Sequence, residues 1–244
     1  MFRALKLVAV AALVLTVSCG GAAAPAQTVP SPTTNVSVAP SQAVPRILAA
    51  GRLDSIPTGT LFVNYMDLPQ VAGGVVKHQH IAGFVYSVQG THEMDLDGAA
   101  PLLIQPGSAA FVAAGVMHSH VNPGATANDW WFIGLRQAGS RPLAILPGQK
   151  ELYTTADLPQ LTTGAYSETL AENRLTSSGV DRQGGSSLRV IYVLEGALTV
   201  GGDAAMAGTL SVGQGAYSVP GANLVLTAGV SGARYLTFTL SPAN

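Results

Sequence analysis

The sequence predicts an all-β protein built from two copies of one barrel-forming unit. Short runs of β-branched and aromatic residues alternate with turn residues, among them 28 Gly and 15 Pro. Apart from an N-terminal apolar run and a weak stretch near 152–161, no window carries a helical period longer than about ten residues. An internal repeat then relates residues 83–120 to residues 189–226.

The first 18 residues are typical of a signal peptide for export. Arg3 and Lys6 provide a positive beginning, and the eleven residues 7–17 form an apolar run. A run of this length is too short to span a bilayer but fits the apolar part of a signal peptide. We therefore expect residues 1–18 to be removed and the remaining chain to be exported.

The signal region ends in the sequence Leu-Thr-Val-Ser followed by Cys19, the single cysteine of the chain. This segment resembles the lipobox of bacterial lipoproteins, whose cysteine becomes the acylated first residue, although Thr16 stands where Leu is usual. The resemblance implies lipidation of Cys19 and attachment to a membrane of the cell envelope. Ordinary cleavage after the small residues 24–26, which would give a secreted or periplasmic protein, is the alternative.

Residues 19–46 consist mostly of Ala, Pro, Ser, Thr and Val, with no charge before Arg46. Such a composition cannot build a core, so we expect a disordered, low-complexity tether. The whole chain has a formal net charge of −1 and a pI of about 6.5. Without a basic patch, nucleic-acid binding is not expected.

Residues 83–120 recur 106 positions later as residues 189–226, without a gap. The matched pairs include Tyr86 with Tyr192, Gly90 with Gly196, Gly107 with Gly213, Phe111 with Tyr217 and Gly115 with Gly221. Turn glycines kept in one register over this length indicate a duplication. We therefore expect an N-terminal barrel over residues 47–145 and a C-terminal barrel over residues 146–244.

Both copies contain short β-branched and aromatic runs between Gly or Pro turns, and these runs predict strands. The expected strands are 84–88, 102–104, 111–113 and 130–135 in the first copy, and 190–194, 198–200, 224–227 and 235–240 in the second. Many short strands at close spacing favour a sandwich or a barrel.

All five histidines lie in the first copy: His78, His80, His92, His118 and His120. Because strand side chains i and i+2 share a face, His78 and His80 can point the same way, and His120 can follow His118 inward. Neutral imidazoles suit Zn, Cu, Ni and Fe, and three such ligands on adjacent strands leave positions for water, oxygen or substrate.

These residues resemble the two sequence motifs of the cupin superfamily, and the resemblance covers roughly residues 50–240. The second cupin motif reads G-x5-P-x-G-x2-H-x3-N. It is matched here by Gly107, Gly115, His118 and Asn122, with Ala113 in the place of Pro.

The first cupin motif, G-x5-H-x-H-x3,4-E-x6-G, is matched more loosely, by His78, His80 and Gly90. Gly83 occupies the position of the Glu, the loop is one residue short, and no glycine lies at the expected distance before His78. Some cupin dioxygenases, which act on thiols and β-diketones, also use three histidines without the Glu.

The resemblance implies two tandem cupin (jelly-roll) β-barrels, with one divalent transition metal held by His78, His80 and His118. The candidate metals are Zn, Cu, Ni, Fe and Mn. Three neutral ligands leave the full +2 charge on the ion, which favours a small anionic ligand such as a carboxylate, enolate, thiolate or hydroxide. Because the signal peptide lacks a twin-arginine pair, we expect metal loading outside the cytoplasm, where intrinsic affinity favours Cu and Zn.

Other residues near the predicted site leave alternatives open. We expect His120 to be a hydrogen-bonded residue behind the ligands, with a fourth ligand or a proton shuttle as alternatives. Tyr86 is a further candidate for this supporting shell. His92 and Glu93 are expected on a solvated strand surface, and Glu93 could replace the missing carboxylate only if its strand turns it inward.

The second copy keeps the turns and loses the metal ligands. In its register His78, His80 and His118 become Gly184, Ser186 and Leu224, and no histidine follows His120. We expect this barrel to be structural and to close the sheet edge of the first.

The leading functional hypothesis is an exported metal-dependent cupin enzyme that uses dioxygenase-like or Lewis-acid chemistry on a small anionic substrate. The alternative is a non-catalytic envelope lipoprotein that binds metal or a small ligand. A purely structural lipoprotein is the third hypothesis and predicts no bound metal.

Overall fold

The computed structural model describes residues 42–141, 143 and 145–243. The predicted signal peptide, Cys19 and most of the predicted tether lie outside the described residues. Strand β1 begins at Val44, so the last three residues assigned to the tether belong to the folded part instead. Within the described residues, no helix is long and apolar enough to cross a membrane.

The first barrel consists of a five-stranded sheet in the order β10-β2-β9-β4-β7 and a four-stranded sheet in the order β3-β8-β5-β6. The bounds are β2 Leu61–Asp67, β3 Val75–His78, β4 Gly83–Gln89, β5 His92–Leu96, β6 Leu102–Ile104, β7 Ala109–Val112, β8 His118–Val121, β9 Asp129–Gln137 and β10 Lys150–Thr154. A single turn of 3-10 helix, η1 (Ala138–Ser140), follows β9.

The second barrel is one seven-stranded sheet with the path β1-β11-β16-β13-β14, to which β12 adds beside β16 and β15 beside β13. The bounds are β1 Val44–Leu53, β11 Tyr166–Leu175, β12 Val180–Gln183, β13 Leu188–Gly202, β14 Gly208–Ser211, β15 Gly215–Ser218 and β16 Leu224–Pro242. The long strands β13 and β16 pair with each other along most of their length. The predicted all-β, two-barrel fold is confirmed.

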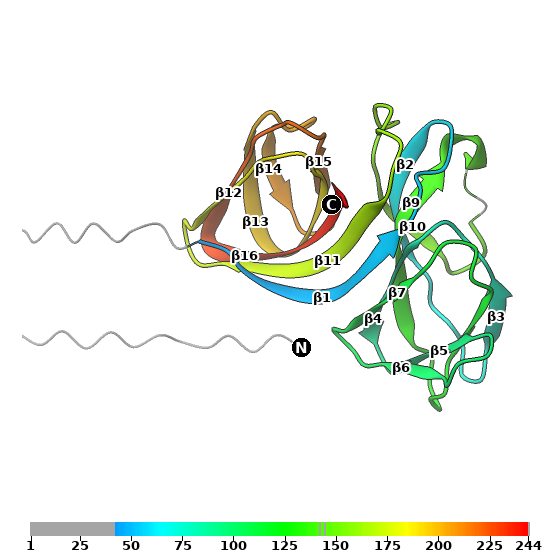
Figure 1. Cartoon of the computed structure of the whole chain (residues 1–244). Helices are drawn as coiled ribbons and strands as arrows, with labels where there is room; N and C mark the ends of the chain where they lie inside the picture. Colours follow the sequence, from blue (N-terminus) through cyan, green and yellow to red (C-terminus); the bar gives the residue numbers. More distant parts are fainter. Residues whose placement is uncertain (1–41, 142, 144, 244) are drawn as a thin grey trace, which may run out of the picture. The chain divides into compact units, whose positions relative to one another are not determined.

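The two barrels exchange strands. The N-terminal strand β1 pairs antiparallel with β11 of the second barrel, and β10 pairs antiparallel with β2 of the first. Figure 1 shows β1 lying beside β11 and β10 near β2. The predicted boundary at residues 145/146 therefore does not separate the sheets, because each sheet takes an edge strand from the other side of that boundary.

The largest apolar cluster lies between the barrels. It joins residues of β2, β4 and β9 to residues of β11, β13 and β16. At its centre Tyr65 stacks on Tyr192, with ring centroids 5.4 Å apart, and its hydroxyl donates to the carbonyl of Val190 over 3.3 Å. This sheet-on-sheet packing buries one outer face of each barrel against the other.

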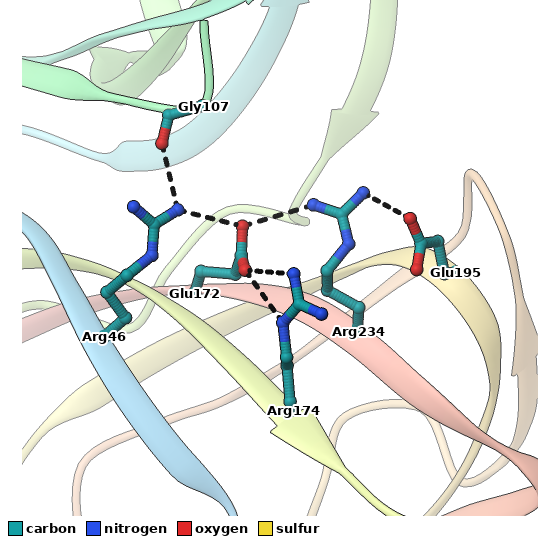
Figure 2. Close-up of polar contacts among 6 residues, drawn as sticks. All are labelled: Arg46, Gly107, Glu172, Arg174, Glu195 and Arg234. Atoms are coloured by element: carbon teal, nitrogen blue, oxygen red, sulfur yellow. Dashed lines mark hydrogen bonds and ion pairs between the residues drawn. The ribbon is translucent and has the colours of Figure 1, made fainter.

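A charged cluster also links the barrels (Figure 2). Arg46 Nη2 on β1 donates to the carbonyl of Gly107 over 3.0 Å and to Glu172 Oε2 over 3.2 Å. Arg234 Nη1 donates to the same carboxylate oxygen over 3.1 Å, and Arg174 Nε donates to Glu172 Oε1 over 3.3 Å. Burial favours a higher pKa for Glu172, but Arg234 and Arg46 outweigh it and hold this pKa below its ordinary value.

Candidate metal centre

Two of the histidines lie on the short strand β8. His118 and His120 alternate with partly exposed residues, and both are fully buried. Strand β8 runs between β3 and β5, so that His118 pairs with His78 on one side and His120 pairs with Met94 on the other. The i, i+2 spacing therefore places both imidazoles inside the first barrel, as predicted.

The two other histidines, His78 and His80, do not both lie on one strand. Strand β3 ends at His78, and His80 lies in the irregular segment that leads into β4. Both side chains still face the site, because the ring centroid of His118 lies 4.8 Å from that of each. The two rings therefore both lie against His118, with His78 at the end of a strand and His80 outside one.

Four imidazoles therefore meet in the first barrel. The ring centroids of His78 and His80 are 5.6 Å apart, and His120 lies 4.8 Å from both His78 and His118. The ligand atoms of His78, His118 and His120 all lie within 4.8 Å of one another, which suits a single metal ion. This group contains two of the predicted ligands together with His120, whereas the predicted ligand His80 is not part of it.

Backbone carbonyls orient two of these rings. His118 Nδ1 donates to the carbonyl of Val116 over 2.8 Å, and His80 Nδ1 donates to the carbonyl of Ile81. The proton on Nδ1 leaves a lone pair on Nε2, and within the described residues the buried Nε2 atoms of both rings have no hydrogen-bond partner. Buried nitrogens of this kind are costly unless they bind something, so the donor set fits a divalent metal.

His120 is held by a chain of polar side chains behind the site. His120 Nδ1 lies 2.9 Å from His92 Nε2, and His92 Nδ1 lies 3.4 Å from Asn128 Nδ2. Asn128 Nδ2 also donates to the carbonyl of Thr91 over 3.0 Å, which fixes the orientation of the amide. The ring of His120 stacks on Trp130, with centroids 4.1 Å apart and planes 15° apart.

The orientation of the Asn128 amide determines which ring nitrogens of His92 and His120 carry a proton. Because Asn128 Nδ2 is a donor, His92 Nδ1 is the acceptor and His92 Nε2 carries the proton. His92 then donates to His120 Nδ1, so the proton of neutral His120 is on Nε2, the nitrogen that faces the other histidines. His120 is thereby set up as a hydrogen-bond donor toward the other imidazoles of the cluster, whereas His80 and His118 present lone pairs.

A cavity of about 460 Å³ lies beside His78 and His80. Its walls are mostly apolar and include Met66, Leu68, Trp130, Phe132 and Leu143, with Gln70, Gln79, Arg136 and Gln149 as polar members. The ring of Phe132 contacts His80, with centroids 4.5 Å apart. A volume of this size is within the range of small-molecule sites.

The fold is shared with known proteins, although no protein-family model and no curated protein matches the sequence. Cocosin, the coconut allergen, superposes with a TM-score of 0.52 at 12% identity, over 81% of this chain and 86% of cocosin. AerE from Microcystis aeruginosa gives 0.52 at 13% identity, over 80% of this chain and 97% of AerE. Procruciferin, an 11S globulin from Brassica napus, gives 0.51 at 11% identity, over 80% and 85%.

The 11S globulins are built from two cupin jelly rolls, and the similarity extends over both barrels of this chain. The protein has the bicupin fold. At these identities the similarity shows the fold alone, so the chemistry of this bicupin has to be argued from its own residues.

The pKa values of His78, His80, His92 and His120 fall below the ordinary range of histidine. Burial, with smaller effects from the neighbouring His118 and from Arg136, lowers the pKa of His78 and of His80 to about 4. Burial also lowers the pKa of His92 to about 4 and that of His120 much further. These rings are therefore neutral near pH 7, which is the form that binds a metal.

Two predictions about supporting residues, those for His92 and Tyr86, need correction in the bicupin structure, whereas Glu93 lies on the outer face of its strand as expected. His92 is not on a solvated surface: it is fully buried and contacts His120. Glu93 alternates with the buried His92 and Met94 on β5, so it does not turn inward to replace a carboxylate ligand. Tyr86 belongs to the cluster between the barrels and lies beside Trp131, on the face of β4 opposite Val85, so it does not support the histidine site.

In the second barrel of the bicupin, apolar side chains occupy the space that corresponds to the histidine cluster of the first barrel. Leu224, the counterpart of His118, is buried in an apolar cluster with Ile191, Leu198, Leu226 and Tyr235. The interior of the second barrel is therefore apolar at the positions where the interior of the first barrel has histidines.

Proposed function

We propose that the protein is an exported bicupin whose first barrel holds one divalent transition metal and acts on a small anionic substrate. The observation that carries this proposal is the convergence of the rings of His78, His80, His118 and His120 beside a cavity. The buried Nε2 atoms of the last three have no partner among the described residues. His78, His80 and His118 are the proposed ligands, because the backbone contacts of His80 and His118 leave their Nε2 lone pairs free.

A divalent metal held there would polarise a bound oxygen as a Lewis acid or take part in electron transfer. The chain supplies the rest of the site. The neutral imidazoles leave the positive charge of the ion uncompensated, the apolar walls exclude water, and His120 directs its Nε2–H at the same space. An anion that entered the cavity would therefore meet both a positive centre and a hydrogen-bond donor.

The second candidate is a bicupin that binds metal or a small ligand without turning it over. One observation favours it: none of the described residues that line the cavity has a carboxylate that could serve as a general base. Measurements of substrate depletion and oxygen uptake by the metal-loaded protein separate the two candidates, whereas metal content does not.

Elemental analysis of the full chain, purified after export, tests the metal site directly. The comparison is a His78→Ala/His118→Ala variant, with Gln79→Ala as the matched control because Gln79 lies between the ligands in sequence and lines the same cavity. We expect near-stoichiometric metal in the wild type and the control, and loss of metal in the double variant. Folded wild-type protein without metal would reject the proposal.

We also propose that the bicupin is anchored to the cell envelope through a lipid on Cys19, which lies outside the described residues. This proposal rests on the lipobox-like segment and the tether-like composition of residues 19–46. Radiolabelled palmitate should enter the exported wild-type chain and should not enter a Cys19→Ser variant. Equal labelling of the two, or no labelling of either, would favour the secreted alternative.

A further inference from the structure

Among the cavity-lining residues that the structure describes, Arg136 alone has a permanent charge. Alternation along β9 explains its position: Trp130 and Phe132 belong to the apolar cluster inside the first barrel, whereas Ile133 and Leu135 face the second barrel. Arg136 continues the even-numbered face and so points into the first barrel. Arg136 lines the same cavity as His78 and His80, which places it close to the proposed ligands.

The guanidinium of Arg136 is held in place but not neutralised. Arg136 Nε donates to Asn64 Oδ1 over 3.2 Å, and the amide of Asn64 donates in turn to Thr154 Oγ1 on the exchanged strand β10 over 3.0 Å. The guanidinium carbon lies 4.8 Å from the ring centroid of Phe132. Within the described part of the chain, no carboxylate forms an ion pair with Arg136, and its two terminal nitrogens have no protein acceptor.

A guanidinium that is fixed through Nε presents its terminal N–H groups as a planar fork. This fork matches the two oxygens of a carboxylate, and such bidentate bonds are the strong ones in a partly desolvated site. A half-buried arginine without a counter-ion is costly, and an anionic ligand would compensate that cost. The ring of Phe132 contacts both the guanidinium of Arg136 and the ring of His80, and it lines the same cavity as an apolar surface.

We propose that the cavity is a binding site for a small monocarboxylate with an apolar body, whose carboxylate is bound by Arg136 and whose other end faces the histidines. One positive side chain balances one negative charge, and the apolar walls at Trp130, Phe132 and Met66 exclude a highly charged ligand. Such a monocarboxylate would be the substrate of the proposed metal site, so any reaction at the end of the ligand that faces the histidines rests on the proposed function. The contact with Arg136 itself does not require the metal.

The experiment measures the binding of three carboxylates, benzoate, phenylacetate and hexanoate, and of their neutral amides to the full chain by calorimetry at fixed pH and salt. Each titration is done with chelator-treated protein and with zinc-loaded protein. The variants are Arg136→Gln and Arg136→Lys. Arg141→Gln is the control, because Arg141 also stacks on a phenylalanine, Phe62, but does not line the cavity.

We expect at least one carboxylate to bind the wild type at least tenfold more tightly than its amide, and Arg136→Gln to abolish this preference without weakening amide binding. Arg136→Lys should retain part of the preference, because it keeps the charge and loses the fork. Arg141→Gln should behave as the wild type does. Circular dichroism of each variant shows that it is folded.

Equal binding of carboxylates and amides to the wild type, no binding of any probe, or an unchanged preference in Arg136→Gln would overturn the inference. The chelator-treated arm separates it from the proposed metal site. Carboxylate preference without any zinc uptake would support the carboxylate-binding site and reject the metal centre. Zinc uptake without carboxylate preference would support the metal centre and reject the carboxylate-binding site.

Discussion

Leu226 pairs with Val200 across the sheet of the second barrel in the same way that His120 pairs with Met94 in the first. Each residue of one pair lies 106 positions after its counterpart in the other. Leu198 and Leu224 correspond in the same way to His92 and His118, and all three leucines are buried in one apolar cluster. The second barrel thus shows how this interior packs when it holds no polar ligands, and it supplies a design for removing the site.

Substitution of leucine for His92, His118 and His120 together should stabilise the metal-free protein and abolish metal binding. The triple variant removes buried nitrogens without partners, and each such group costs about 1–3 kcal/mol. We expect a net gain of about 2 kcal/mol in the free energy of unfolding, because the loss of stacking on Trp130 offsets part of the benefit. Urea unfolding in the presence of chelator measures the change, and a loss of stability would show that the barrels do not share this packing.

The tautomers of the site histidines should differ in the metal-free protein. His80 and His118 donate from Nδ1 to backbone carbonyls, so their Nε2 atoms should give the nitrogen-15 shifts of unprotonated nitrogen. His120 should show the opposite pattern, with a protonated Nε2, because His92 donates to its Nδ1. Two-bond proton–nitrogen NMR spectra at pH 7.5 report both nitrogens of each ring, and an unprotonated Nε2 on His120 would contradict the assignment.

The same assignment predicts unequal effects on metal affinity. A His118→Gln variant removes a proposed ligand and should weaken zinc binding at least a hundredfold, measured by competition with a chromophoric chelator. A His120→Gln variant removes a donor that does not need to touch the metal and should weaken zinc binding by less, about 10- to 100-fold at most. Comparable losses in the two variants would identify His120 as a ligand.

Sequence alone predicts the fold because the repeat and its turn glycines are local features. It also predicts His78, His80 and His118, whose spacing follows the pairing of strands. It places His92 wrongly because the side of β5 that faces inward depends on pairing with β6 and β8, which a short strand does not reveal. The exchange of β1 and β10 and the inward turn of Arg136 likewise depend on contacts between distant segments, although the two-residue alternation from Trp130 and Phe132 could have indicated Arg136.

The exchanged strand β1 lies tightly against the first barrel at Gly51. A Cβ atom added there would overlap the ring of Phe111 on β7, and the backbone of Gly51 needs no positive φ, so the restriction is steric. A Gly51→Ala variant should therefore lose about 1–3 kcal/mol of stability by urea unfolding. A Gly51→Ala/Phe111→Leu double variant should recover part of this loss, whereas equal stability of Gly51→Ala and wild type would show that the strand can move.

Glu168 should make the protein less stable as the pH rises. It lies on β11 opposite Gly51, it is fully buried, and neither carboxylate oxygen has a hydrogen-bond partner among the described residues. Burial disfavours the charged form and raises the pKa of Glu168 from 4.5 to about 7. Between these two values the unfolded chain is ionised while the folded protein keeps the proton, so the folded state loses stability from pH 4.5 to pH 7 and gains none back above it.

At about 1.4 kcal/mol per pKa unit, this difference corresponds to about 3 kcal/mol of stability. A Glu168→Gln variant cannot ionise, so the free energy of unfolding of the variant minus that of the wild type should be about 3 kcal/mol larger at pH 8 than at pH 4.5. Taking the difference at each pH cancels the titration of every other group. A Glu151→Gln variant, changed at an exposed glutamate of β10, should show no such dependence, and the same difference at both pH values for Glu168→Gln would mean that a partner or solvent stabilises the buried carboxylate.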